Sequence, residues 1–407
     1  MHKNNSNLPT NVVIASVLLA LFANTKWVNN IVLAAFPSLS GVFMAAMYGV
    51  VVPLLFVVGI FFQKRSLNGL SRSHLAISFI CLFWYIATSV FIGSPSVSFA
   101  FFGVFTLAAF LIPGLIRIDV RIFLLVTMIS SSMGVFYVDQ IIINSIMEEG
   151  VLSMGLCYSM LVPVIANLVY IRYFYNEENK WMKIVMLPIT AINIFYLVQM
   201  TMFGSRGPVL CVLLLIASFF IFKITEDSSI RIRKGRVFII IGCAAIGALF
   251  FTLILQSISN YLAQFDISLN FIDKFLRLDD GGDMSNGRDD IKKVAWSGIG
   301  ESPILGHGIS QFDRHTSMNY PHNFFIQMLY DGGIVLTSCV LIPIIRSLMK
   351  KVKAIDEEEY ALLLCLCFAS VPGALFSGDL WNQIVLWMFL GFVLAKDSIF
   401  TNKKYSL

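Results

Sequence analysis

Long apolar segments alternate with short polar ones along almost the whole chain. As helices, most are long enough to cross roughly 30 Å of hydrocarbon, and they predict about twelve spans. The spans lie near residues 9–24, 38–62, 74–93, 97–115, 121–138, 152–171, 183–203, 208–222, 237–256, 323–345, 359–376 and 381–395. The first run stops early, at Asn24 and Lys26, and residues 27–36 are a candidate for a segment lying flat at the interface. We therefore expect an all-α polytopic membrane protein.

The composition agrees with this fold class. Of 407 residues, 57% are apolar and 13% are charged, which excludes an ordinary soluble domain. All seven cysteines fall inside expected spans, where small packing residues are the simplest interpretation. No phosphate-binding glycine loop, nucleophile elbow or zinc signature is present.

The basic residues predict the orientation. Most of the 29 Lys and Arg residues lie in every second loop, beginning with the N-terminal segment, and basic loops favour the cytoplasmic side. The short loops on the other side contain only Lys26 and Arg206. Both termini are therefore expected in the cytoplasm, and the net charge of +5 reflects topology and does not indicate nucleic-acid binding.

One long outside loop divides the chain into residues 1–256 with nine spans, the loop 257–321, and residues 322–407 with three spans and a tail. A connector of this length usually has a function of its own. We expect a surface helix over 261–277 and a short helix over 289–296. Asp279, Asp280 and Asp283 could offer oxygen ligands to a cation, but their spacing matches no calcium loop and favours a solvated turn.

Arg206 is a candidate anion-binding residue. Pro208 suits the first turn of a helix, so Arg206 is expected just ahead of a helix N-terminus, where free backbone N–H groups favour phosphate. The alternative is an arginine that reaches toward the membrane interface.

His322 is the candidate general base. Pro321 predicts a helix start there, with Tyr320 or the residue before it near the cap. The positive end of a helix dipole favours neutral imidazole, which can accept a proton from a hydroxyl. The alternative is a capping or lipid-headgroup contact.

Further residues near His322 are candidates for supporting roles. Asp331 lies about 13 Å further along the helix and must face the bundle interior, where tying helices together is the favoured role. Gly332 and Gly333 permit close packing or a kink. His307 and His315 are expected to be mobile loop histidines.

Three elements in this order resemble the O-antigen polymerase and O-antigen ligase superfamily of bacterial envelope glycosyltransferases. They are Arg206-Gly207-Pro208-Val209-Leu210, similar to an Arg-x3-Leu element; Gly287-Arg288 in the large loop; and His322-Asn323-x9-Gly333-x2-Leu336. The last resembles a His-Asn-x9-Gly-x-x-Gly element in which Leu336 replaces the usual small residue.

The resemblance implies metal-independent, inverting glycosyl transfer from an undecaprenyl-diphosphate-linked oligosaccharide at the periplasmic face of the bacterial inner membrane. No cofactor is implied. Arg206 and Arg288 would hold the diphosphate, His322 would activate the acceptor hydroxyl, and Tyr320, Asn323 and Asp331 would support them. Membrane lipids and a chain-length regulator protein are the further partners it suggests.

Polymerisation of O-antigen repeat units is the favoured activity. The alternative is the ligase of the same superfamily, which transfers polymer to lipid A–core. A flippase or transporter for lipid-linked oligosaccharides is the rival of another class, but no inverted repeat is visible and the polar residues gather at one face.

Overall fold

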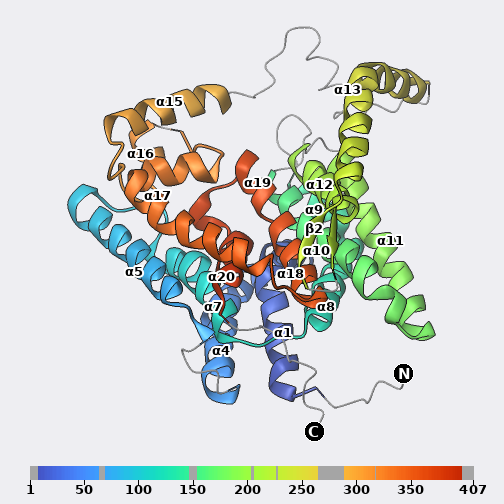
Figure 1. The fold of residues 1–407 in the computed structure, drawn as a ribbon, viewed down its shortest axis with the longest axis horizontal. Helices are drawn as coiled ribbons and strands as arrows, with labels where there is room; N and C mark the ends of the chain where they lie inside the picture. Colours follow the sequence, from blue (N-terminus) through green and yellow to red (C-terminus); the bar gives the residue numbers. More distant parts are fainter. Residues whose placement is uncertain are drawn as a thin grey trace.

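The computed structural model describes residues 8–63, 69–145, 154–202, 206–225, 228–264, 288–316 and 318–396. These residues form helices and one short hairpin, which confirms the all-α membrane class (Figure 1). The acidic residues Asp279, Asp280 and Asp283 and most of the expected surface helix lie outside the described residues.

The first half of the chain contains α1 (Thr10–Ala23), α2 (Thr25–Ala35), η1 (Pro37–Leu39), α3 (Ser40–Ala46), η2 (Met47–Val51), α4 (Val52–Val57), η3 (Val58–Phe62), α5 (Arg72–Ala87), η5 (Thr88–Ile92), α6 (Phe99–Phe101), η6 (Phe102–Ala108), α7 (Ala109–Leu115), α8 (Val120–Ser132), η7 (Met133–Tyr137), α9 (Val138–Ile143), α10 (Met154–Tyr173), η8 (Tyr175–Glu177) and α11 (Lys180–Met202). The second half contains α12 (Arg206–Ile221), β1 (Phe222–Ile224), β2 (Ile230–Ile232), α13 (Lys234–Ala263), α15 (Arg288–Glu301), α16 (Phe312–Thr316), α17 (Phe324–Lys351), α18 (Glu357–Phe368), α19 (Val371–Phe376), η9 (Leu380–Asn382) and α20 (Ile384–Leu394).

Each of the twelve expected spans coincides with a helix or with consecutive helical segments. Within the described residues, seven helices are long and apolar enough to cross a membrane. The bent pair α1–α2 would be an eighth if the two helices are counted as one span. The helices at Phe99–Leu115, Gly207–Ile221 and Ile384–Leu394 are apolar but shorter. The number of crossings and the orientation therefore remain predictions.

The first expected span ends in a sharp bend. The axes of α1 and α2 differ by 71°, and Asn24 lies between them. Asn24 Nδ2 donates to the Thr127 carbonyl at 3.3 Å and to Ser130 Oγ at 3.2 Å, both on α8. Hydrogen bonds from the bend to a neighbouring helix satisfy polar groups that would otherwise face hydrocarbon. The bend agrees with the early stop of the first apolar run.

The protein core lies around α10, α18 and α20. In the most apolar stretch of Gly155–Tyr173 and of Glu357–Phe376, 72% of the residues are buried. In four of the peripheral spans the corresponding share is 22% to 33%. The backbones of α20 and α7 approach so closely at Gly391 that a Cβ there would collide with the Phe110 carbonyl. Large apolar side chains such as Phe79 (70% exposed) and Phe136 (76%) point outward from the bundle. Such exposure suits a surface covered by lipid.

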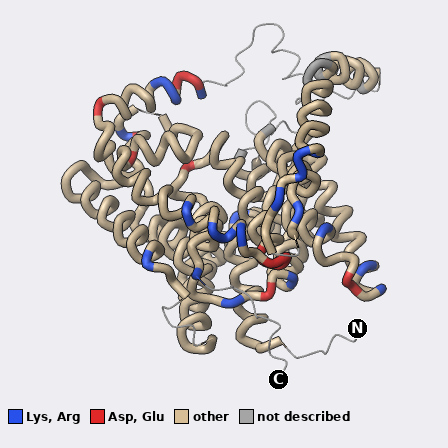
Figure 2. Tube along the Cα trace, viewed as in Figure 1, with Lys and Arg blue, Asp and Glu red and all other residues tan. Residues whose placement is uncertain are grey.

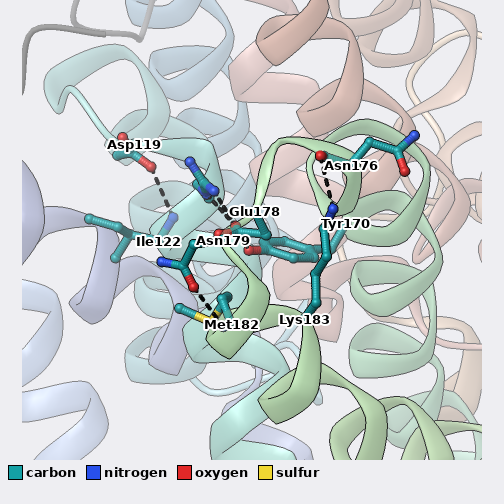
Figure 3. A network of polar contacts seen from close by, with 9 residues as sticks. Asp119, Ile122, Tyr170, Asn176, Glu178, Asn179, Met182 and Lys183 are labelled. Atoms are coloured by element: carbon teal, nitrogen blue, oxygen red, sulfur yellow. Dashed lines mark hydrogen bonds and ion pairs between the residues drawn. The ribbon is translucent and has the colours of Figure 1, made fainter. Parts of the chain in front are cut away.

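A polar network joins α8, α10 and α11 where their connecting segments meet (Figure 3). Arg121 and Tyr170 both donate to Glu178 Oε1. Asp119 caps α8 by accepting from the Ile122 N–H at 2.9 Å. Paired charges of this kind tolerate burial better than isolated ones, because each group keeps a partner.

The β1–β2 hairpin is a small addition to the expected all-α fold. Lys223 and Arg231 face each other across its antiparallel register. The Ile230 N–H donates to the Val352 carbonyl at 3.0 Å, which ties the hairpin to the end of α17. Figure 2 shows Lys and Arg around the hairpin and around the C-terminal end of α17.

Helix α17 breaks at Gly333. This residue has φ 59° and ψ −163°, a region that only glycine enters readily. The Ile334 and Val335 N–H groups donate to the carbonyls of Pro303 and Ile304, at 2.9 and 3.2 Å, because the break removes their helical acceptors. Of the two roles expected for Gly332 and Gly333, close packing or a kink, the structure shows a kink at Gly333, and the segment after α15 contacts the helix there.

Candidate functional site

The candidate site lies at the start of α17. Asn323 is the N-cap, and its side chain accepts from the N–H groups of Phe325 and Ile326 at 3.0 and 3.1 Å. His322 precedes the cap with φ 55°, in the left-handed region. The expectation that Pro321 starts the helix is therefore wrong: the chain turns at His322, and the helix begins two residues later. Asparagine is among the preferred N-caps, a signal that the sequence does carry.

His322 is partly buried against an aromatic ring. The Tyr320 and His322 ring centroids are 4.4 Å apart. His322 Nδ1 is buried and has no hydrogen-bond partner within the described residues. Burial first, and then the charges of Arg288 and Lys292, lower the pKa of His322 to about 4. The imidazole is thus neutral at pH 7, and no described residue occupies its Nδ1, which suits a general base. The expected cause was the helix dipole; burial and two cations are the causes here.

Arg288 is the first residue of α15 and lies close to His322. Its Nη1 donates to the Phe376 carbonyl at 3.0 Å, and Asn323 Nδ2 donates to the neighbouring Leu375 carbonyl at 3.0 Å. Carbonyls at a helix C-terminus lack helical partners, so both side chains also cap α19. Arg288 therefore has a structural role beside any role toward a ligand.

Arg206 is the first residue of α12, so the helix starts at Arg206 and not after it. Its side chain lies outside what the structure describes, and contact with a diphosphate remains a prediction. The next residue, Gly207, packs directly on Tyr158, since a Cβ at Gly207 would collide with the Tyr158 hydroxyl. The backbone at the start of α12 is thereby fixed beside α10.

Asp331 is fully buried in α17 and joins separate segments. Trp381 Nε1 donates to Asp331 Oδ2 at 2.6 Å, and the Ser310 N–H donates to the same oxygen at 3.2 Å. The Asp331 carbonyl accepts from the Gly308 N–H at 2.8 Å. These contacts agree with the favoured role of tying elements together.

The loop histidines differ from expectation. His307 stacks on Tyr330 with ring centroids 4.6 Å apart, and its Nε2 is 2.7 Å from the Gly298 carbonyl. His315 lies on α16 with its ring 5.6 Å from that of His307. His307 is partly buried with both ring contacts and a hydrogen bond, whereas His315 is exposed and lies on a helix and not in a loop.

A cavity of about 310 Å³ lies next to this cluster. Its lining includes Asn24, Lys26, Tyr158, Tyr320, Asp379 and Gln383. Tyr320 belongs both to this wall and to the packing around His322. Asp379 was missed in the sequence, although a carboxylate between two apolar runs at a membrane boundary is a recognisable signal.

The structure thus brings Tyr320, His322, Asn323 and Arg288 together at the meeting point of α15, α17 and α19. Asp331 lies further along α17 and is fully buried.

Residues 189–341 match the O-antigen ligase family. The matched region contains Arg206, Arg288, His322 and Asp331, and it confirms the resemblance to the polymerase and ligase superfamily. Members of this family are glycosyltransferase-like enzymes, so the match indicates activity of the polymerase or ligase type. No curated protein matches the chain.

Proposed function

We propose that this protein polymerises undecaprenyl-diphosphate-linked repeat units of a surface polysaccharide by inverting glycosyl transfer. The reaction would take place at the periplasmic face of the inner membrane, the side on which the distribution of basic residues predicts the loops around His322.

The observation that carries the proposal is the state of His322. Its imidazole is neutral, is partly buried, and has a buried Nδ1 with no partner in the described part of the chain. A buried polar atom without a partner is costly in a folded protein and suits a position that a ligand completes. Arg288 adds a cation close enough to lower the pKa of this imidazole.

The reaction follows from these groups. His322 accepts the proton of the acceptor hydroxyl, and the oxygen attacks the anomeric carbon of the donor sugar. The bond between that carbon and the diphosphate oxygen breaks with inversion, and undecaprenyl diphosphate leaves with the bonding electrons. Arg288, joined by Arg206, stabilises the charge on the leaving group. A bound diphosphate would also offset the Arg288 charge, which raises the basicity of His322 when the donor is present.

Ligation of finished polymer to lipid A–core is the second candidate, because the matched family carries the O-antigen ligase description. Both reactions use the same donor and the same departure of diphosphate, so the acceptor distinguishes them.

The first test is extension of lipid-linked repeat units by the purified protein in detergent. We expect a ladder of products with wild type, and a loss of turnover of at least about 100-fold in His322→Ala, as for removal of a general base. Binding of undecaprenyl diphosphate should remain within about twofold, since His322 is not a diphosphate ligand. Near-wild-type turnover in His322→Ala would refute the general-base role.

A lipopolysaccharide gel of a deletion strain then separates the two reactions. Core bearing a single repeat unit in the deletion, with a ladder restored by wild type, indicates a polymerase. Core alone indicates a ligase, or a flippase if repeat units accumulate on the cytoplasmic face. A transporter would yield no product in detergent, where there is no compartment to transport across.

A further inference from the structure

The first turns of α17 carry a row of three polar side chains in a mostly apolar helix. They are Asn323, Gln327 and Asp331, spaced four residues apart, and residues four apart lie on the same face of a helix. Gln327 is 2% exposed and Asp331 is fully buried. Polar groups buried in a membrane bundle need partners within the protein, so this face of α17 requires a polar contact surface.

That surface is the connecting segment between α19 and η9, residues 375–381. Gln327 Nε2 donates to Asp379 Oδ1 at 2.5 Å, and Gln327 Oε1 accepts from the Leu380 N–H at 2.8 Å. Because a backbone N–H needs an acceptor, the amide of Gln327 is fixed in this orientation. The other two side chains of the row bind the ends of the connecting segment: the Leu375 carbonyl by Asn323 and the Trp381 indole by Asp331.

The connecting segment also holds the Arg288 side chain. The Phe376 carbonyl accepts from Arg288 Nη1 at 3.0 Å. Gly378 follows with φ 100°, so the chain turns between this carbonyl and Asp379. Asn323 fixes the residue before Phe376, and Gln327 fixes the far side of the turn. The position of this acceptor of Arg288 is therefore set by α17 from both sides.

The direction of a guanidinium matters for a phosphate ligand. Arginine binds phosphate oxygens through a planar fork of N–H groups, so a tilted fork loses hydrogen bonds that a correctly oriented one makes. Small displacements of groups that stabilise a leaving group are costly for the reaction as well. The acceptor that orients Arg288 should thus influence binding of the donor.

We propose that Gln327 is a positioning residue for the donor site: it holds the connecting segment against α17 and thereby orients the Arg288 guanidinium toward the diphosphate. The inference rests on the proposed function, since it concerns the donor side of the same reaction. Gln327 is buried with both amide groups bonded, so it acts through Arg288 and not by contact with the diphosphate.

The test measures binding of sugar-free undecaprenyl diphosphate to the full-length protein in detergent by calorimetry. Gln327→Met keeps the length of the side chain and removes both hydrogen bonds. The matched control is Thr337→Val on the same helix, which removes a buried hydrogen bond of 2.7 Å to the Gly333 carbonyl and leaves those of the connecting segment in place. Both variants should lower the melting temperature, but only Gln327→Met should weaken binding, by about 3- to 10-fold. Arg288→Ala should weaken it more, by about 10- to 100-fold, as for lost hydrogen bonds to a charged group.

A double-mutant cycle separates positioning from a general loss of structure. Arg288→Ala removes the group that Gln327 is proposed to orient. Gln327→Met should therefore cause no further loss of affinity in the Arg288→Ala background, whereas independent effects would multiply.

A second pair of variants exchanges donor and acceptor at the same contact. Gln327→Glu places a carboxylate against Asp379 and should weaken binding at least as much as Gln327→Met. Adding Asp379→Asn supplies an amide that can donate to the new carboxylate, which still accepts from the Leu380 N–H. Much of the lost affinity should then return. This pair also provides the test if Gln327→Met does not fold.

Three results would overturn the inference. One is wild-type affinity in Gln327→Met, and another is an equal loss in Thr337→Val. The third is an effect of Gln327→Met that is undiminished in the Arg288→Ala background. Turnover that needs His322, together with wild-type affinity in Gln327→Met, would keep the proposed function and refute the positioning role. Coupled losses at Gln327 and Arg288, in a protein without turnover on any lipid-linked substrate, would do the reverse.

Discussion

Replacing Tyr320 by alanine should raise the pKa of His322. Burial is the largest cause of the shift from the ordinary value of 6.5 to about 4, and the Tyr320 ring lies 4.4 Å from the imidazole. Water admitted in place of the ring would stabilise the imidazolium ion. Arg288 and Lys292 would still oppose protonation, so the recovery should be partial, about 1 to 2 pH units. Tyr320→Phe keeps the ring and should leave the value near that of wild type.

The shift can be measured in two ways. Carbon-13 labelling of histidine gives five signals to titrate, and the one missing in His322→Gln belongs to His322. The acid limb of kcat/KM reports the same group, because a general base works only when deprotonated. That limb should lie near pH 4 in wild type and move upward in Tyr320→Ala. At pH 7 the His322 imidazole is largely neutral in wild type and in Tyr320→Ala. Any loss of rate in the variant at that pH therefore comes from lost substrate contacts.

Two results would contradict this reasoning. A wild-type His322 that titrates near 6.5 would mean that the imidazole is far better hydrated than the structure indicates. If the pKa of His322 stays near 4 in Tyr320→Ala, the nearby cations and not burial by the Tyr320 ring are the cause of the low pKa. Lys292→Gln would then be expected to raise it.

Two predictions concern the scaffold of the site. Gly333→Ala should lower the melting temperature, because a backbone of φ 59° costs a non-glycine residue about 1–3 kcal/mol and the added Cβ meets the Ile304 carbonyl; Gly300→Ala on α15, where a Cβ meets nothing, is the control and should change it little. Asn323→Ala should lower the free energy of unfolding by about 1 kcal/mol, because it removes the cap of α17. Asn323→Asp keeps the cap and loses only the hydrogen bond to the Leu375 carbonyl. An equally large loss of stability in both variants would refute the capping role.

Much of the fold follows from the sequence, since apolar run length alone predicts where the helices lie. Their ends are harder to predict. Pro321 looked like a helix start because proline favours the first turn, but the left-handed turn at His322 delays the helix until after the Asn323 cap. A positive φ cannot be predicted from the hydropathy of the sequence.

The candidate site was predictable only in part. His322 and Arg288 stand out as ionisable residues outside the apolar runs, and the structure places them together. The cavity could not be predicted, because Lys26 and Asp379 are separated by most of the chain and line the same cavity only in the folded protein. The partner of Asp331 was equally hidden, since an indole N–H from Trp381 reaches it across helices.

The break in α17 has a consequence for the order in which the protein assembles. The Ile334 and Val335 N–H groups take their acceptors from Pro303 and Ile304, on the segment that follows α15. In hydrocarbon each unpaired backbone group costs several kcal/mol, so this helix is incomplete as an independently inserted unit. The segment after α15 must therefore dock on α17 before this helix reaches its native form. The end of α17 that carries His322 thus reaches its native structure late in folding. A stalled or truncated chain would contain the His322-Asn323 motif without the native arrangement of its side chains.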